Sequence, residues 1–173
     1  MDKRKDLPTG LKPPKVVTVV VEATKDSRNT YNVNGMFIKL ENVLYSSITY
    51  PWDYGFIPKT MWEDGKPLRA IILTEYPTFP GCLIDAVPIG LLKLSVNGVR
   101  KDKLLAVPLN DLEYKEIRDI KKVSEHNLKE TEEFFENYKK PKTDNIKIIA
   151  WTGSKDALRA VTHAMKIYDR KNE

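Results

Sequence analysis

The side chains best suited to chemistry fall in residues 50–69. Tyr50 and Tyr54 enclose a proline, and Gly55 follows them, so both phenols are predicted to lie on a rigid, irregular segment of backbone. The turn at residues 64–69 then carries one carboxylate and two cations. Phenols beside fixed cations can form an anion-binding pocket. The alternative is that the two tyrosines only pack, half-buried, with solvated hydroxyl groups.

The composition is that of an ordinary folded domain. The chain has 173 residues, of which 41% are hydrophobic and 31% charged, and this length predicts one domain. Residues 1–15 mix charges with prolines and are predicted to be an N-terminal arm, followed by a single domain over residues 16–173. A single cysteine, Cys82, suits a reducing cytoplasm, and the chain has no apolar run long enough for a membrane span. The net charge of +5 favours polyanionic partners.

Turn signals and hydrophobic periodicity predict an α+β domain. Strands are expected at residues 16–22, 30–33, 36–40, 70–74, 83–95, 104–107 and 146–151. Asn34-Gly35 and Asn97-Gly98 each indicate a hairpin. Two amphipathic helices are expected in the last third, with Ser124 and Ser154 as their N-caps. Short antiparallel strands joined by tight turns favour a small closed barrel that exposes no strand edges.

Several ordered motifs resemble the soluble (family I) inorganic pyrophosphatases from about residue 14 onward. They are Val20-Val21-Glu22, Tyr50-Pro51-x-x-Tyr54-Gly55, Asp64-Gly65-x-Pro67, Tyr76-Pro77-x-x-Pro80-Gly81, Pro88-Ile89-Gly90, residues 103–108 and Phe134-Phe135-Glu136-x-Tyr138-Lys139. The resemblance implies an OB-like barrel with two C-terminal helices, assembled into oligomers. It also implies cleavage of diphosphate with several Mg²⁺ ions held by a cluster of carboxylates, while lysines, an arginine and tyrosines hold the phosphates.

Departures from the family pattern are concentrated among these site positions. The family turn Asp-Gly-Asp-Pro-x-Asp corresponds here to residues 64–69, where Lys66 and Arg69 replace two aspartates. Lys101 replaces another aspartate, and Val96 and Asn97 stand where the family has an acidic pair. Family residues that would contact substrate are matched by Thr30, Asn32 and Asn42. The family-equivalent site residues that remain are Glu22, Tyr50, Tyr54, Asp64, Lys103, Tyr138 and Lys139.

Electrostatics makes a cluster of several Mg²⁺ ions unfavourable at such a site. An ammonium group about 4 Å from a divalent ion is repelled by roughly 8 kcal/mol at an effective dielectric constant of about 20. Asp64 is then the only weak candidate for a metal ligand, and no cofactor is predicted unless Mg²⁺ binds as in the family. Other carboxylates could rebuild a metal site instead, and the candidates are Asp53, Glu63, Asp85 and Asp102.

Three interpretations of the introduced cations follow. They are surface charges left after the site decayed, or the metal site is rebuilt by those other carboxylates, or the cations stand in for the missing metal ions. On the third interpretation the anion-binding residues are Lys66, Arg69, Lys101, Lys103, Lys139, Tyr50, Tyr54 and Tyr138.

The sequence thus favours a protein of the pyrophosphatase fold that has lost catalysis and binds phosphate-rich ligands. RNA or a ribonucleoprotein such as the ribosome is the expected partner, with phosphate or diphosphate as further ligands and a homo-oligomer as the assembly. Trp52 and Trp62 are the candidates for stacking on bases. The alternatives are a working Mg²⁺-dependent inorganic diphosphatase with an altered site and a non-catalytic subunit that joins an active paralogue.

Overall fold

The β-branched run near the N-terminus forms the buried strand β1 (Val17–Ala23), on which the rest of the sheet is built. The computed structural model describes residues 6–35, 37–45, 47–139, 142 and 144–173. β1 pairs with β4 (Asp53–Phe56) along one edge and with β6 (Leu83–Val96) along the other. Because every second residue of a strand faces the same side, β1 supplies Val17, Val19 and Val21 to one core cluster.

Five strands close into a barrel in the order β1, β4, β5 (Arg69–Ile72), β8 (Lys103–Pro108) and β6, which returns to β1. All of these pairs are antiparallel except β5 and β8, which run parallel. The predicted OB-like barrel is confirmed. Closure leaves these five strands without a free edge.

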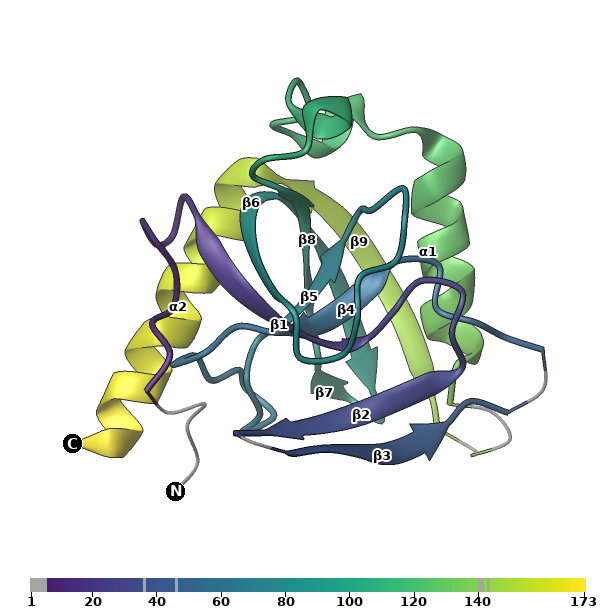
Figure 1. Ribbon diagram of the computed structural model, residues 1–173, viewed down its shortest axis with the longest axis horizontal. Helices are drawn as coiled ribbons and strands as arrows, with labels where there is room; N and C mark the ends of the chain where they lie inside the picture. Colours follow the sequence, from purple (N-terminus) through teal and green to yellow (C-terminus); the bar gives the residue numbers. More distant parts are fainter. Residues whose placement is uncertain (1–5, 36, 46, 140–141, 143) are drawn as a thin grey trace.

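The second half of β6 extends beyond the barrel. It pairs there with β7 (Val99–Arg100), through the predicted hairpin at Asn97 and Gly98, and with β9 (Ile146–Gly153). The other predicted hairpin joins β2 (Asn29–Asn34) to β3 (Phe37–Val43), where Gly35 has a φ of 57°. This hairpin runs along one end of the barrel as a separate two-stranded sheet (Figure 1).

The two helices pack on different parts of the core. α1 (Glu125–Asn137) adds Phe134 and Phe135 to a cluster with strand residues of β5, β6 and β8, and α2 (Ser154–Asn172) adds four small residues to the other cluster. In Figure 1 the helices flank the barrel on opposite sides. Two short 3₁₀ helices, η2 (Leu112–Tyr114) and η3 (Ile120–Lys122), lie in the segment before α1. No helix in the described residues has the length and apolarity that a membrane span requires.

Two local predictions are wrong. Ser124 caps α1 as expected, but the N-cap of α2 is Gly153, and Ser154 is the first helical residue. Asp119 supplies the missing acceptor, since its Oδ2 accepts hydrogen bonds from the amide of Ser154 at 2.9 Å and from its hydroxyl at 2.8 Å. The carboxylate belongs to the N-cap residue of η3, far away in the sequence, so no local motif could indicate it.

The second error concerns the segment around Gly55. Residues 53–56 form the regular strand β4 rather than an irregular loop. Gly55 is required there by close approach, because a Cβ atom at this position would lie 1.9 Å from the carbonyl oxygen of Val20 in β1. A glycine between two strands thus lets the barrel close tightly.

The first described residues contact the barrel. The amide of Thr18 donates to the carbonyl of Thr9 at 2.8 Å, and Leu7 packs against Val20, Val33 and Phe56. Residues 1–5 of the predicted arm lie outside the described residues, and the boundary at residue 15 stays a prediction.

Replacing Gly55 with alanine should lower the free energy of unfolding by about 3 kcal/mol, because the backbone of β1 would have to move away from the new methyl group. Urea denaturation followed by tryptophan fluorescence measures this. Gly98→Asn is the matched control: no atom lies within 4 Å of a Cβ there, and asparagine tolerates its positive φ. Equal losses in the two variants would contradict the close-packing explanation.

Candidate functional site

A pocket of about 720 Å³ opens between the barrel, the β2–β3 hairpin and the C-terminal end of α1. Such a volume is in the range of small-molecule sites. The pocket brings together every residue for which the sequence predicts anion binding: Tyr50, Tyr54, Lys66, Arg69, Lys101, Lys103, Tyr138 and Lys139. Glu22 and Asp64, the two carboxylates that match the family, also line it.

Aromatic packing against α1 positions the tyrosines. The rings of Tyr50 and Tyr54 stack with centroids 5.8 Å apart. Phe134 lies 4.7 Å from the Tyr50 ring, and Phe135 lies 5.7 Å from the Tyr54 ring. Tyr138, at the end of the helix, stacks on Phe134 at 5.4 Å. The rings are therefore core residues, more deeply buried than the packing alternative expected, and their side chains also line the pocket. Their role in binding anions stays a prediction.

All three phenols keep their protons at neutral pH. Burial raises the pKa of Tyr50, Tyr54 and Tyr138, and in Tyr54 and Tyr138 the neighbouring phenols add to the effect. The hydroxyl of Tyr50 is 2.9 Å from that of Thr30 on the hairpin. A protonated phenol can donate a hydrogen bond to an anionic oxygen, which a phenolate cannot do.

Strand register places two cations side by side. Arg69 in β5 is paired with Lys103 in β8, at the start of the parallel ladder. Lys103 is only 5% exposed, and its Nζ lies 5.7 Å from the centroid of the Tyr54 ring and 5.9 Å from that of Phe135. Burial, followed by repulsion from Arg69, lowers the pKa of Lys103 to about 7, and Lys139 and Lys101 contribute in the same direction.

The three carboxylates that line the pocket have different partners and different exposure. Glu22, in β1, forms an ion pair with Arg69. Asp64 accepts a hydrogen bond from the amide of Lys66 at 3.0 Å, which stabilises the predicted turn. Glu41 lies on the exposed strand β3. The sequence argument missed Glu41 because no motif distinguishes it from other charged residues on an exposed strand.

Several other predicted positions lie away from the pocket lining. Val96 is buried in β6, and Asn97 forms the hairpin turn, where its side chain binds Asp144. Trp52 and Trp62 are both 7% exposed, and the indole of Trp52 donates to Thr131 in the core. Neither tryptophan offers an open ring face for a base, so their proposed role in stacking is wrong.

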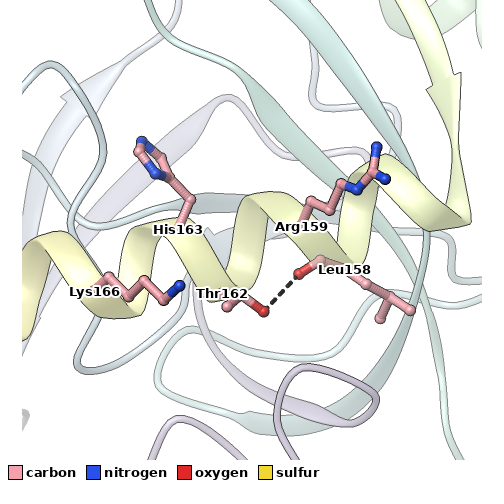
Figure 2. Close-up of a pocket in the computed structure, with 5 residues that line it drawn as sticks. All are labelled: Leu158, Arg159, Thr162, His163 and Lys166. Atoms are coloured by element: carbon pink, nitrogen blue, oxygen red, sulfur yellow. Dashed lines mark hydrogen bonds between the residues drawn. The ribbon is translucent and has the colours of Figure 1, made fainter.

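A second hollow lies along the outer face of α2 (Figure 2). Its lining comes from one helix, and the hydroxyl of Thr162 is bonded to the carbonyl of Leu158. It holds the cations Arg159 and Lys166 beside His163 but no carboxylate among its lining residues. The pocket at the barrel is therefore the candidate site.

A family model described as inorganic pyrophosphatase matches residues 19–169. The chain belongs to the inorganic pyrophosphatase family. A soluble inorganic pyrophosphatase 3 of Arabidopsis thaliana is 40% identical over 165 residues, covering 94% of this chain and 76% of that protein. An inorganic pyrophosphatase of Picrophilus torridus is 38% identical and covers 95% of this chain and 94% of its own length.

Solved pyrophosphatases share the fold along almost the whole chain. The crystal structure of the inorganic pyrophosphatase from Thermus thermophilus has a TM-score of 0.91 at 36% identity, covering 96% of this chain and 99% of the other. That of Helicobacter pylori has a TM-score of 0.88 at 27% identity. The predicted pyrophosphatase fold is thus confirmed.

These relatives overturn the prediction of a catalytically inactive, RNA-binding protein. Proteins 37–40% identical over nearly the whole chain are named inorganic pyrophosphatases, which supports an active enzyme and gives no support to RNA as a partner. The physical error lay in equating altered metal positions with lost activity, although the cations and phenols of the predicted site still converge on one pocket. The expectation of no metal cofactor is likewise wrong for a member of this family, since the family uses Mg²⁺.

The side chains that line the pocket do not fit a cluster of several Mg²⁺ ions in the family manner. Within the described residues, no group of three or more His, Cys, Asp or Glu side chains converges as metal ligands would. The alternative of a metal site rebuilt by other carboxylates finds no support among the described residues either. Asp53 accepts hydrogen bonds from Lys25 and Thr78, Asp85 from Thr18, and Asp102 from Arg100 at 2.9 Å. Glu63 is exposed and does not line the pocket.

The lowered pKa of Lys103 predicts a pH-dependent stability. The unfolded lysine has a pKa near 10.4, so between about pH 7 and 10 the folded state binds fewer protons and the stability must rise with pH. Below about pH 7 both states are protonated, and the cost of burying the ammonium group is fully present.

Lys103→Met should remove this dependence. The free energy of unfolding of the native protein, minus that of the variant, should increase by roughly 3 kcal/mol from about pH 7 to about pH 9.5. Urea denaturation at both pH values measures it, and Lys166→Met serves as the exposed control with no such change. A difference independent of pH would contradict the lowered pKa of Lys103.

Proposed function

We propose that this protein is an inorganic diphosphatase, which hydrolyses diphosphate to two phosphates. The observation that carries the proposal is its 38% identity to the Picrophilus torridus pyrophosphatase, with each chain covered over more than nine-tenths of its length. A match of that extent includes all of the strands and helices that surround the pocket.

The pocket suits a small polyanion. Lysine and arginine side chains from the turn, β5, β8 and the end of α1 face it, and charge-assisted hydrogen bonds to phosphate oxygens are among the strong polar interactions in proteins. The protonated phenols of Tyr50, Tyr54 and Tyr138 supply further donors. The walls of this pocket therefore offer far more donors than acceptors, as an anion requires.

Hydrolysis needs a proton acceptor for water and a proton for the leaving phosphate. We assign the acceptor to Asp64, because Glu22 is held by Arg69 and Glu41 lies on the exposed hairpin. The oxygen of water attacks one phosphorus atom, the bond to the bridging oxygen breaks, and that oxygen leaves with the bonding electrons. Lys103, with a pKa of about 7 in the empty pocket, supplies a proton to the leaving phosphate.

The names of the relatives and the composition of the chain bear on where this enzyme is located and how it assembles. The curated relatives from Arabidopsis thaliana and Oryza sativa are named soluble pyrophosphatases. We place this enzyme in the cytoplasm, because its single cysteine suits a reducing compartment. Because the family resemblance implies oligomers, we also propose that it assembles as a homo-oligomer.

Purified protein should release two phosphates per diphosphate in a colorimetric assay with Mg²⁺. Asp64→Asn should lower kcat by about a hundredfold or more, because the amide cannot accept the proton from water. Asp169→Asn, on the exposed face of α2, is the matched control and should leave kcat unchanged. No phosphate release by the native protein, with Mg²⁺ or Mn²⁺, would overturn the proposed function.

A further inference from the structure

Cations outnumber carboxylates in the pocket lining, where six lysine and arginine side chains face three acidic ones. We propose that the pocket binds inorganic diphosphate through these fixed cations without needing a divalent metal ion, and that Lys66 and Lys101 contact the phosphate oxygens. This inference takes its ligand from the proposed function, but it concerns binding alone.

The carboxylates do not neutralise the cations at the pocket entrance. Glu22 pairs with Arg69, and Lys139 lies 3.9 Å from Asp144, outside the pocket lining. In the described part of the chain, neither Lys66 nor Lys101 forms an ion pair. Both side chains therefore present uncompensated charge to the cavity, and a bound polyanion would supply the counter-charge.

The pocket cations lie close enough to repel one another. Burial lowers the pKa of Lys139, and Lys101 and Lys66 add to the effect, while Lys101 also disfavours the charged form of Lys103. These effects extend from the turn at residues 64–69 across β8 to the end of α1. A polyanion in the middle of this ring would relieve all of the repulsions together.

The same arrangement works against a metal ion that binds first. A divalent cation would meet repulsion from each of these side chains. Among the described residues its oxygen ligands would be reduced to Asp64, the exposed Glu41 and the paired Glu22. The lysine and arginine side chains can thus neutralise phosphate charge, which bound metal ions usually do.

Lys66 and Lys101 are also the cleanest positions to test. Lys66 is exposed and Lys101 is half-buried, so their replacement by methionine leaves no buried charge without a partner. Arg69 is unsuitable, because its removal would leave Glu22, whose side chain is 8% exposed, buried and unpaired.

The test is isothermal titration of metal-stripped protein with sodium diphosphate in EDTA at low ionic strength. The native protein should bind diphosphate, Lys66→Met and Lys101→Met should each weaken the affinity about tenfold, and the double variant should show a smaller loss of affinity on adding salt. Lys166→Met, on α2 and outside the pocket, is the control and should bind as the native protein does.

The outcomes separate this inference from the proposed function when phosphate release is measured on the same preparation. Turnover with Mg²⁺ but no binding in EDTA overturns metal-free binding and leaves the diphosphatase intact. Binding in EDTA without turnover under any metal supports the inference and overturns the proposed function. Equal effects of the pocket variants and Lys166→Met would show that the lysines act only through net charge, and would overturn the assigned contacts.

Discussion

The buried ammonium group of Lys103 is the feature on which the site depends. Its Nζ lies near the ring faces of Tyr54 and Phe135, which offset part of the cost of removing a charge from water. Burial, followed by repulsion from Arg69 beside it, lowers the pKa of Lys103 to about 7. Burial and neighbouring cations disfavour the ammonium form of Lys103, so an anion that binds next to it stabilises that form. Anion binding is therefore coupled to the protonation of Lys103.

The strand register of the barrel and the packing of α1 position the side chains around Lys103. The register of β5 and β8 sets Arg69 against Lys103, and β1 brings Glu22 to the same end of the barrel. The phenylalanines of α1 that close the core also contact the site tyrosines. The packing that stabilises the domain thus positions the chemical groups, and a change in one disturbs the other.

The cations that replace family aspartates bear on how this pocket binds metal ions. They do not reveal whether its other side chains still bind and cleave a substrate. Lys66, Arg69 and Lys101 explain why the described carboxylates do not assemble a cluster for several ions. They do not imply an inactive protein, because they line the same pocket as the family-equivalent lysines and tyrosines that remain. Relatives named inorganic pyrophosphatases, similar over nearly the whole chain, make the enzymatic interpretation the consistent one.

Local chemistry alone was enough to predict both hairpins at Asn-Gly pairs, the Ser124 cap and most of the strands, because each depends on residues a few positions apart. The family motifs also identified most of the charged and phenolic side chains that line the pocket, although not Glu41. Contacts between distant segments decided what no motif contains: the Asp119 cap of α2, the close approach that requires Gly55, the pairing of Glu22 with Arg69 and the burial of Lys103. Burial and charge pairing depend on which segments meet in space, and only the folded chain brings these segments together.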